Sequence, residues 1–238
     1  MNGIYQSHQR GPMTNIILQH YNGEPKELEK LSFENIKNYA HSIGADHEIV
    51  PGKPFREHLT NPCQKVYCID EHWDNYDNVL MLDPDVFIRR NLVQNIFDIP
   101  GNGIHGSTQV NLKQKLIRLG RITKANPYWA GSIYKFNKKE RQLLRSAMPA
   151  DDKWMDVYNQ PYNFEDEGIL AELAGKVGFP IRYLDFTWNQ CSFLPNIKAA
   201  KMVHIRTKKP GHLNGSWENG GKRNKIENYY ELAAQGII

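Results

Sequence analysis

"NVLMLDPDVFIRRN", residues Asn78 to Asn91, is the most informative stretch of the sequence, because it joins a short apolar run to two closely spaced aspartates. The run Val79–Leu82 is continuously apolar, which is typical of a strand buried on both faces of a sheet. Asp83 and Asp85 follow at once, with a proline between them that restricts the backbone. Ligands of open α/β sheets bind beyond the carboxyl ends of the strands, so the two carboxylates mark a candidate site.

The chain before this stretch alternates strand, helix and strand. A buried strand is predicted at Asn15–Leu18 and a second one at 46–52. Between them, apolar residues at helical spacing over 25–44 predict a helix that starts near Pro25 and ends at Gly44. This order of elements is how a parallel α/β sheet begins.

The rest of the chain continues this pattern. Helices are predicted at 61–69, 90–99, 110–122, 138–148, 164–178 and 220–236, and strands at 103–110, 129–137, 181–185 and 200–205. We therefore expect one α/β domain over 13–238, with a Rossmann-like, mainly parallel central sheet, flanking helices and a C-terminal helix. Residues 1–12 are polar and aperiodic, and we expect a disordered leader or a non-native remnant there.

The composition disfavours several classes of protein. The 238 residues are 40% hydrophobic and 24% charged, without an apolar run long enough for a membrane span and without a secretory signal. The formal net charge of +4 is not clustered, which disfavours a nucleic-acid partner and is compatible with an anionic small substrate. The three cysteines, Cys63, Cys68 and Cys191, fit no zinc or redox spacing, which indicates a reducing compartment and predicts a cytoplasmic location.

The acidic pair, Asp83 and Asp85, allows three interpretations. Two carboxylates one residue apart repel each other, and a divalent cation with oxygen ligands would relieve that repulsion. Alternatively, Asp85 caps the following turn and Asp83 merely ends the strand. The string "DPDVF" also satisfies the D-x-D-x-[TV] pattern of haloacid-dehalogenase phosphatases, which would make Asp83 a nucleophile. That class places its nucleophile after the first strand of its core, whereas two strands are predicted before Asp83.

Three segments, in the right chain order, resemble the sugar-nucleotide glycosyltransferases of the GT-A fold. "YDNVLMLDPDVFIRRN" is similar to their D-x-D strand, and "NPYWAGSIYKFN" is similar to the strand that lines their donor-sugar pocket. "MVHIRTKKPGH" resembles the late H-x-x-G-x-x-K-P-W element of glycogenin and of bacterial galactosyltransferase-like enzymes. The chain departs from the pattern at Trp129, where the family has asparagine, and around Lys209, which comes one residue early.

The resemblance implies a set of ligands for the donor. Asp83, Asp85 and His204 would bind Mn²⁺ or Mg²⁺, and carboxylate and imidazole ligands suit such an ion. Lys208 and Lys209 would bind the diphosphate, with Arg206 adding positive charge. As plain alternatives, His204 is a core histidine and the lysines belong to a solvated loop.

Further residues are assigned to the nucleotide and the sugar. The candidates are Gln19, His20 and Tyr21 after the first strand, Lys65 on the helix before the acidic strand, and the small pair Ala130 and Gly131, which lets a sugar approach the backbone. The tyrosine could stack on uracil or could be an ordinary loop residue.

The acidic start of "FEDEGIL" is similar to the family's D-Q-D-x-L-N. Asp166 is the first candidate for a general base on the acceptor hydroxyl, followed by Glu165 and Glu167, whereas a retaining transfer needs no dedicated base. The alternative is that all three acids simply stabilise the N-terminus of a helix.

We therefore expect a metal-dependent glycosyltransferase of the hexosyltransferase type, similar to compact bacterial and large-virus members. It would move a sugar from a nucleotide-diphosphate donor, with UDP-sugar preferred, to a hydroxyl acceptor such as a glycan. The alternatives are a phosphatase with Asp83 as nucleophile and a non-catalytic module that binds sugar nucleotides. The sequence leaves the sugar, the acceptor, the stereochemical outcome and the oligomeric state open.

Overall fold

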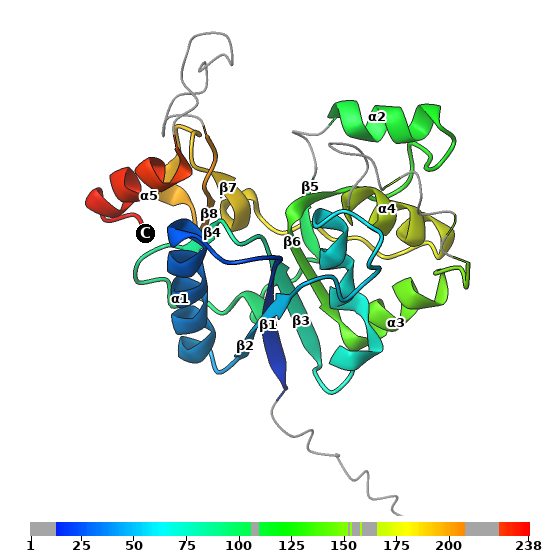
Figure 1. The fold of residues 1–238 in the computed structure, drawn as a ribbon, viewed down its shortest axis with the longest axis horizontal. Coiled ribbons are helices and arrows are strands. Elements are labelled where there is room, and N and C mark those ends of the chain that lie inside the picture. The colour runs from blue at the N-terminus through cyan, green and yellow to red at the C-terminus, as the bar shows by residue number, and fades with distance from the viewer. Residues whose placement is uncertain (1–12, 106–109, 152, 154–157, 159–165, 208–223) are drawn as a thin grey trace, which may run out of the picture.

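The computed structural model describes residues 13–105, 110–151, 153, 158, 166–207 and 224–238, with the side chains of 110–112 left aside. The leader expected at residues 1–12 lies outside these ranges. Within them the chain forms a five-stranded sheet with helices on both faces and a smaller three-stranded sheet at one end (Figure 1).

The central sheet has the order β2-β1-β3-β6-β5. Its strands are β1 (Asn15–Tyr21), β2 (Asp46–Pro51), β3 (Asn78–Leu82), β5 (Gly103–His105) and β6 (Trp129–Asn137). β1 pairs with both β2 and β3 in parallel, whereas β6 is antiparallel to β3 and to β5. Because β6 is antiparallel to both of its neighbours, the other strands all run in one direction, and the sheet is mainly parallel, as predicted, with β6 reversed. The chain passes from β5 to β6 through α2 (Val110–Arg118) at one end of the sheet, so these two strands run in opposite directions.

Alternating side chains of the central strands serve two cores. On β3, Val79 and Met81 pack on one face with the 3₁₀-helix Pro62–Ile69, α3 (Lys138–Ser146) and α4 (Asp166–Lys176). Leu80 and Leu82 pack on the other face with α1 (Glu27–Ser42). This two-sided burial is what the continuous apolar run predicted.

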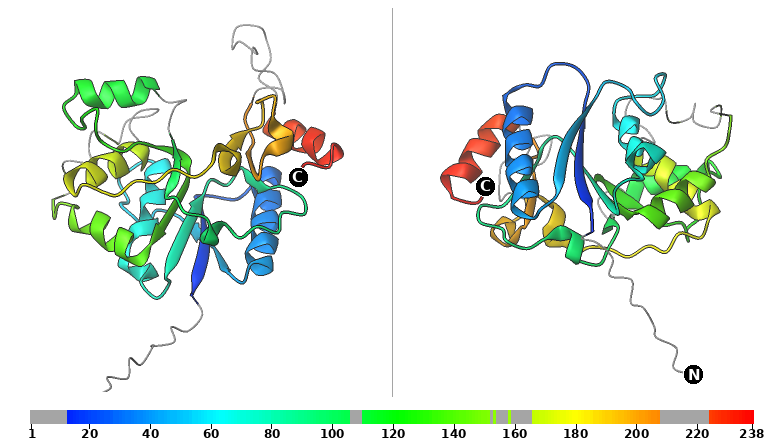
Figure 2. Two further views of the ribbon diagram at one scale, coloured as in Figure 1. Left: turned by 180° about the vertical axis from the view of Figure 1, so that it is seen from behind. Right: turned by 90° about the horizontal axis from the view of Figure 1, so that it is seen from below.

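The small sheet brings distant parts of the chain together. Its order is β4-β8-β7, with β4 at Val86–Ile88, β7 at Gln190–Cys191 and β8 at Met202–His204. β4 and β8 are antiparallel, and Val86 is paired with His204. The C-terminal helix α5 (Lys225–Ala234) lies beside α1 (Figure 2). Its Leu232 packs with Phe87 and Val203. The strand that follows the acidic pair is thus bound to the strand that carries the late histidine.

Most predicted elements are present, and the differences are local. The segment 90–99 holds only a single 3₁₀ turn at Ile96–Asp98, and the strand expected at 181–185 is reduced to one bridge between Tyr183 and Gly103. The helix at 61–69 is 3₁₀ rather than α, and β1 extends three residues beyond Leu18. The three cysteines are free, and no helix among the described residues is long and apolar enough to cross a membrane.

Candidate functional site

The acidic pair lies at the carboxyl end of β3, in the middle of the central sheet. The amide of Asp83 donates to the carbonyl of Ser132 on β6 at 3.1 Å. The carbonyl of Asp85 accepts from the amide of Ile205, just beyond β8, at 2.9 Å. The loop between the two aspartates is therefore fixed to both sheets at once.

His204 converges on both carboxylates. Its Nε2 lies 3.1 Å from Asp85 Oδ1 and 3.9 Å from Asp83 Oδ2. One ligand atom from each of the three residues lies within 4.8 Å of the others, and all three side chains are at least four-fifths buried. The structure thus brings together the three side chains that the sequence proposed as metal ligands.

Lys65 holds the other side of Asp83. Its Nζ lies 2.6 Å from Asp83 Oδ1, 2.8 Å from Asp166 Oδ2 and 2.5 Å from the carbonyl oxygen of Gly131. Burial alone would lower the pKa of Lys65, but Asp166 and Asp83 outweigh it and raise the pKa above its ordinary value. Lys65 is therefore a buried, charged link between the acidic pair and α4, and its three acceptors occupy its hydrogens.

Sequence reasoning missed Lys225, the first residue of α5. Its Nζ forms an ion pair with Asp85 Oδ2. Burial would raise the pKa of Asp85, but His204 and Lys225 outweigh it and lower the pKa below the ordinary range. Arg206 adds a further cation, with Nη1 3.3 Å from His204 Nε2. No local motif marks Lys225, because it reaches the site only through the packing of α5.

These residues fit a divalent cation. Two carboxylate oxygens and one imidazole nitrogen are the donors that Mn²⁺ accepts readily. The remaining carboxylate oxygens are oriented by Lys65 and Lys225, in the way that outer contacts commonly orient metal ligands. Asp83, Asp85 and His204 would hold the ion.

The acids of α4 are buried rather than exposed at a helix end. Asp166 Oδ2 accepts from Tyr134 Oη at 2.8 Å in addition to its ion pair with Lys65. Glu167 accepts from the amide of Gly131 at 2.6 Å and from Tyr128 Oη at 2.9 Å. Their burial and partners argue against the simple helix-terminus alternative. Glu165 lies outside the described residues.

Burial raises the pKa of Glu167 from 4.5 to about 8, and the charge of Asp166 adds to the effect. An acid with a raised pKa stabilises the fold at low pH, and this contribution is lost as the pH rises from 4.5 through about 8. Because glutamine imitates the protonated acid, Glu167→Gln is expected to gain stability relative to wild type as pH rises from 5 to 9. The gain should be on the order of a few kcal/mol in thermal or urea unfolding. A stability difference that does not change with pH would contradict this assignment.

Gly131 is required by α4. A Cβ at this position would lie 2.7 Å from Glu167 Oε1 and 3.2 Å from Asp166 Oδ2. The sequence assigned the small Ala130–Gly131 pair to the approach of a sugar. The structure adds a second reason, since the glycine lets the acids of α4 reach the strand.

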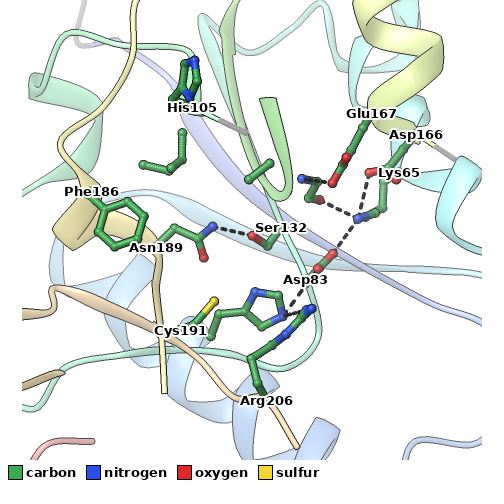
Figure 3. Close-up of a pocket in the computed structure, with 14 residues that line it drawn as sticks. Lys65, Asp83, His105, Ser132, Asp166, Glu167, Phe186, Asn189, Cys191 and Arg206 are labelled. Atoms are coloured by element: carbon green, nitrogen blue, oxygen red, sulfur yellow. Dashed lines mark hydrogen bonds and ion pairs between the residues drawn. The ribbon is translucent and has the colours of Figure 1, made fainter. Parts of the chain in front are cut away.

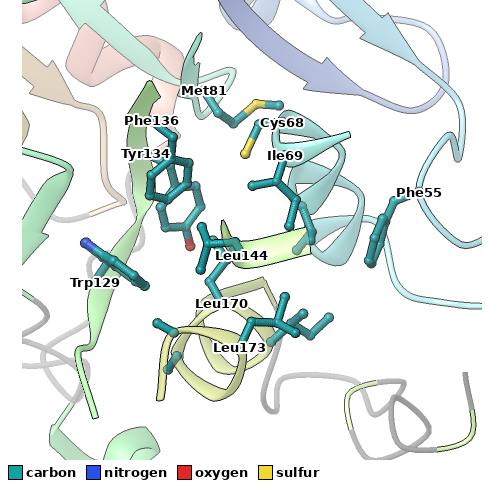
Figure 4. Packing of buried hydrophobic residues seen from close by; sticks show 14 of the residues in the cluster. Phe55, Cys68, Ile69, Met81, Trp129, Tyr134, Phe136, Leu144, Leu170 and Leu173 are labelled. Atoms are coloured by element: carbon teal, nitrogen blue, oxygen red, sulfur yellow. The ribbon is translucent and has the colours of Figure 1, made fainter. Parts of the chain in front are cut away.

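The core behind the site fixes these acids in place. All residues from Asp166 to Ala174 on α4 are buried. Leu170 and Leu173 pack against the aromatic face of β6, where Tyr134 and Phe136 lie (Figure 4). Because α4 is packed on all sides, it cannot rotate about its axis, and the core therefore fixes the positions of Asp166 and Glu167.

Two cavities meet at the acidic pair. The first has a volume of about 260 Å³ and is lined by Ala130, Gly131, Asp166, Glu167 and His204 among others (Figure 3). The second, of about 400 Å³, is lined by His20, Tyr21, Asn22, Asn61, Pro62, Pro84 and Asp85 among others. Lys65 and Asp83 line both cavities. A ligand with two different ends could therefore fill both cavities with its centre over the acidic pair.

Gln19 does not line the larger cavity, unlike His20 and Tyr21, with which it was assigned to the nucleotide. Its side chain is fully buried and donates to Ser32 Oγ at 3.0 Å and to the carbonyl of Asp83 at 3.3 Å. It lines neither of these two cavities. Its contacts therefore support the loop of the acidic pair from beneath.

The wall of the smaller cavity opposite α4 is neutral and polar. Asn189 donates to Ser132 Oγ, and its Oδ1 has no hydrogen-bond partner among the described residues. Phe186 lies next to it and is 43% exposed (Figure 3). Trp188, which lies between them in the sequence, is fully buried. This wall of the cavity thus combines an aromatic surface with polar side chains. Lys208 and Lys209 lie outside the described residues.

No family model matches the sequence, and no curated protein matches it. Among solved structures, the chain resembles a glycosyltransferase involved in glycosylation of the major capsid of PBCV-1. The identity is 15% and the TM-score 0.56, covering 92% of this chain and 99% of that one. It also resembles galactosyltransferase LgtC, solved with donor and acceptor sugar analogues, at 14% identity and a TM-score of 0.53, covering 92% and 95% of the two chains.

A third similar structure is that of the bifunctional glycosyltransferase WbbM, at 11% identity and a TM-score of 0.57. The match covers 97% of this chain but 52% of that longer one. These likenesses show that the chain has the GT-A fold, which the three resembling segments of the sequence together predicted. Asp83-Pro84-Asp85 fits the D-x-D pattern of that fold.

Proposed function

We propose that the protein is a metal-dependent glycosyltransferase that uses a nucleoside-diphosphate sugar. The observation that carries the proposal is the convergence of Asp83, Asp85 and His204 between two cavities at the carboxyl end of the central strand. A cation held there would face the middle of a donor whose two ends fill the two cavities. The GT-A fold supports this assignment.

The larger cavity suits the nucleoside. Tyr21 lies at its wall, with its ring edge-on to Phe33 at 6.1 Å between centroids, so its orientation is supported from one side. His20 Nε2 lies 2.8 Å from the carbonyl oxygen of Gly52, and burial lowers the pKa of this imidazole. A neutral histidine and an aromatic ring suit a base, and we favour uracil, as the sequence resemblance implied.

The smaller cavity suits the sugar. Ala130 and Gly131 let a ring approach the strand, while Phe186 offers an apolar surface. Asp166 lines the wall of this cavity that is formed by α4, opposite Phe186, and its carboxylate could accept the proton of an acceptor hydroxyl there. Asp166 is our first choice for that role in an inverting transfer, and Glu167 is the second.

The chain's own residues arrange the charges of the reaction. A bound Mn²⁺ or Mg²⁺ would neutralise charge on the leaving diphosphate. Lys65 holds Asp83 and Asp166 in fixed positions, and Arg206 adds positive charge beside His204. Lys208 and Lys209, which the resemblance assigned to the diphosphate, keep that role in the proposal.

The similar structures suggest the class of acceptor. One belongs to an enzyme involved in capsid glycosylation, and another was solved with donor and acceptor sugar analogues. We propose that this chain likewise transfers a hexose to a hydroxyl group of a glycan.

A thermal-shift panel tests the proposal. UDP, UDP-glucose, UDP-galactose and the guanosine counterparts are added with and without Mn²⁺. We expect stabilisation by uridine compounds that depends on Mn²⁺, since a ligand at 100 times its Kd stabilises by about 2.7 kcal/mol. The absence of a metal-dependent shift with every nucleotide would overturn the proposal. Slow hydrolysis of a bound donor sugar separates an enzyme from a non-catalytic binding module.

A further inference from the structure

Lys65 and Lys225 each form an ion pair with one carboxylate oxygen of the acidic pair. Asp83 gives Oδ1 to Lys65 at 2.6 Å and turns Oδ2 toward His204 at 3.9 Å. Asp85 gives Oδ2 to Lys225 and turns Oδ1 toward His204 at 3.1 Å. Each carboxylate therefore has one oxygen neutralised by an ammonium group and one oxygen directed at the candidate cation position.

This arrangement leaves little net negative charge for a bare cation. Asp83, Asp85 and Asp166 carry three negative charges, and Lys65, Lys225 and the Arg206 guanidinium beside His204 carry three positive charges. A unit charge about 6 Å from a divalent ion repels it appreciably even at the high effective dielectric of a protein surface. An anionic diphosphate reverses the balance, because the same cations then attract it.

The two lysines differ in their freedom to change partner. Lys65 has two further acceptors, Asp166 and the Gly131 carbonyl, and its side chain is 9% exposed. Lys225 has only Asp85 as an ion-pair partner among the described residues, and its side chain is 35% exposed. Lys225 can therefore turn to an anion more easily than Lys65, and the buried carboxylate of Asp85 would then be paired by His204 and by the bound cation.

We propose that Lys225 makes binding of the cation depend on binding of the diphosphate. The site then binds the cation and the diphosphate together with higher affinity than it binds the cation alone. In the free protein the Lys225 ammonium group is paired with the carboxylate of Asp85. When the complex of cation and nucleoside diphosphate binds, the ammonium pairs with the diphosphate. The inference rests on the proposed function and adds the C-terminal helix to the donor site.

The test measures two affinities with opposite expected changes. Binding of Mn²⁺ alone is followed by the electron paramagnetic resonance signal of the free ion, and binding of UDP at saturating Mn²⁺ by calorimetry. Lys225→Met is expected to bind bare Mn²⁺ about threefold more tightly or better, and to bind UDP with Mn²⁺ about threefold more weakly or worse. Lys225→Arg keeps the charge and should restore both affinities toward those of wild type.

The controls separate the possible outcomes. Lys139→Met removes an exposed lysine at the start of α3 and should change neither affinity. Equal weakening of both affinities in Lys225→Met, or no change in either, would overturn the coupling role. If Lys225→Met unfolds, the ratio of the two affinities in Lys225→Gln decides. A wild-type protein that binds no nucleotide with Mn²⁺ would refute the proposed function instead.

Discussion

Asp83→Asn is expected to abolish metal-dependent binding of the donor and to lower sugar transfer by roughly 10³-fold or more. The variant keeps the size of the side chain but removes a carboxylate that faces His204 at 3.9 Å. Charge stabilisation by a catalytic metal ion contributes several kcal/mol to the transition state, which corresponds to this loss. The measurements are the Mn²⁺-dependent thermal shift with the donor and the rate of donor hydrolysis.

Asp85→Asn should have the same effect, because Asp85 Oδ1 faces the same position. Asp77→Asn is a suitable control, since Asp77 precedes β3 at its opposite end and its side chain bonds to Thr14. Retention of the metal-dependent shift by both site variants would show that the cation binds elsewhere. A phosphate mimic trapped on Asp83 would instead favour the phosphatase alternative.

Lys65→Met is expected to destabilise the fold by about 3–5 kcal/mol, the largest effect on stability that we foresee. The substitution preserves most of the volume but leaves Asp83 and Asp166 facing each other without the ammonium group that joins them at 2.6 and 2.8 Å. It also leaves the Gly131 carbonyl without this donor. Urea unfolding at neutral pH gives the change in the free energy of unfolding.

A second substitution identifies the cause of that loss. Because the cost arises from unpaired carboxylates, Lys65→Met combined with Asp166→Asn should recover part of the stability, whereas independent effects would add. Lys139→Met serves again as the control, with a change within about 0.5 kcal/mol. A Lys65→Met variant as stable as wild type would contradict the buried charge network.

The sequence predicted the larger elements because their signals are local. The apolar run before Asp83 and the strand over 129–137 were identified with their bounds, since each is bounded by turn or charged residues. β4 escaped detection because three residues cannot establish a period, and its partner β8 lies far along the chain. The sequence could not show which strand is reversed in the mainly parallel sheet, since hydrophobic patterning does not encode whether neighbouring strands run parallel.

The residues of the candidate site were likewise predictable only where their signals are local. Asp83, Asp85 and His204 could be proposed because carboxylate and imidazole groups in a family pattern carry their chemistry with them. Lys225 could not, because its role depends on how α5 packs against α1 and β8. Gln19 was assigned to a ligand because it follows a strand, but the sequence could not show that its side chain faces the core.

The ladder between β4 and β8 also determines when the site can form. All five strands of the central sheet lie before residue 138, whereas His204 reaches Asp85 only after β8 has paired with β4. Contacts between residues so far apart in sequence form slowly during folding. A nascent chain can thus complete its main sheet while the acidic pair still lacks its imidazole. The three candidate metal ligands are then assembled only after β8 has been synthesised and has paired with β4.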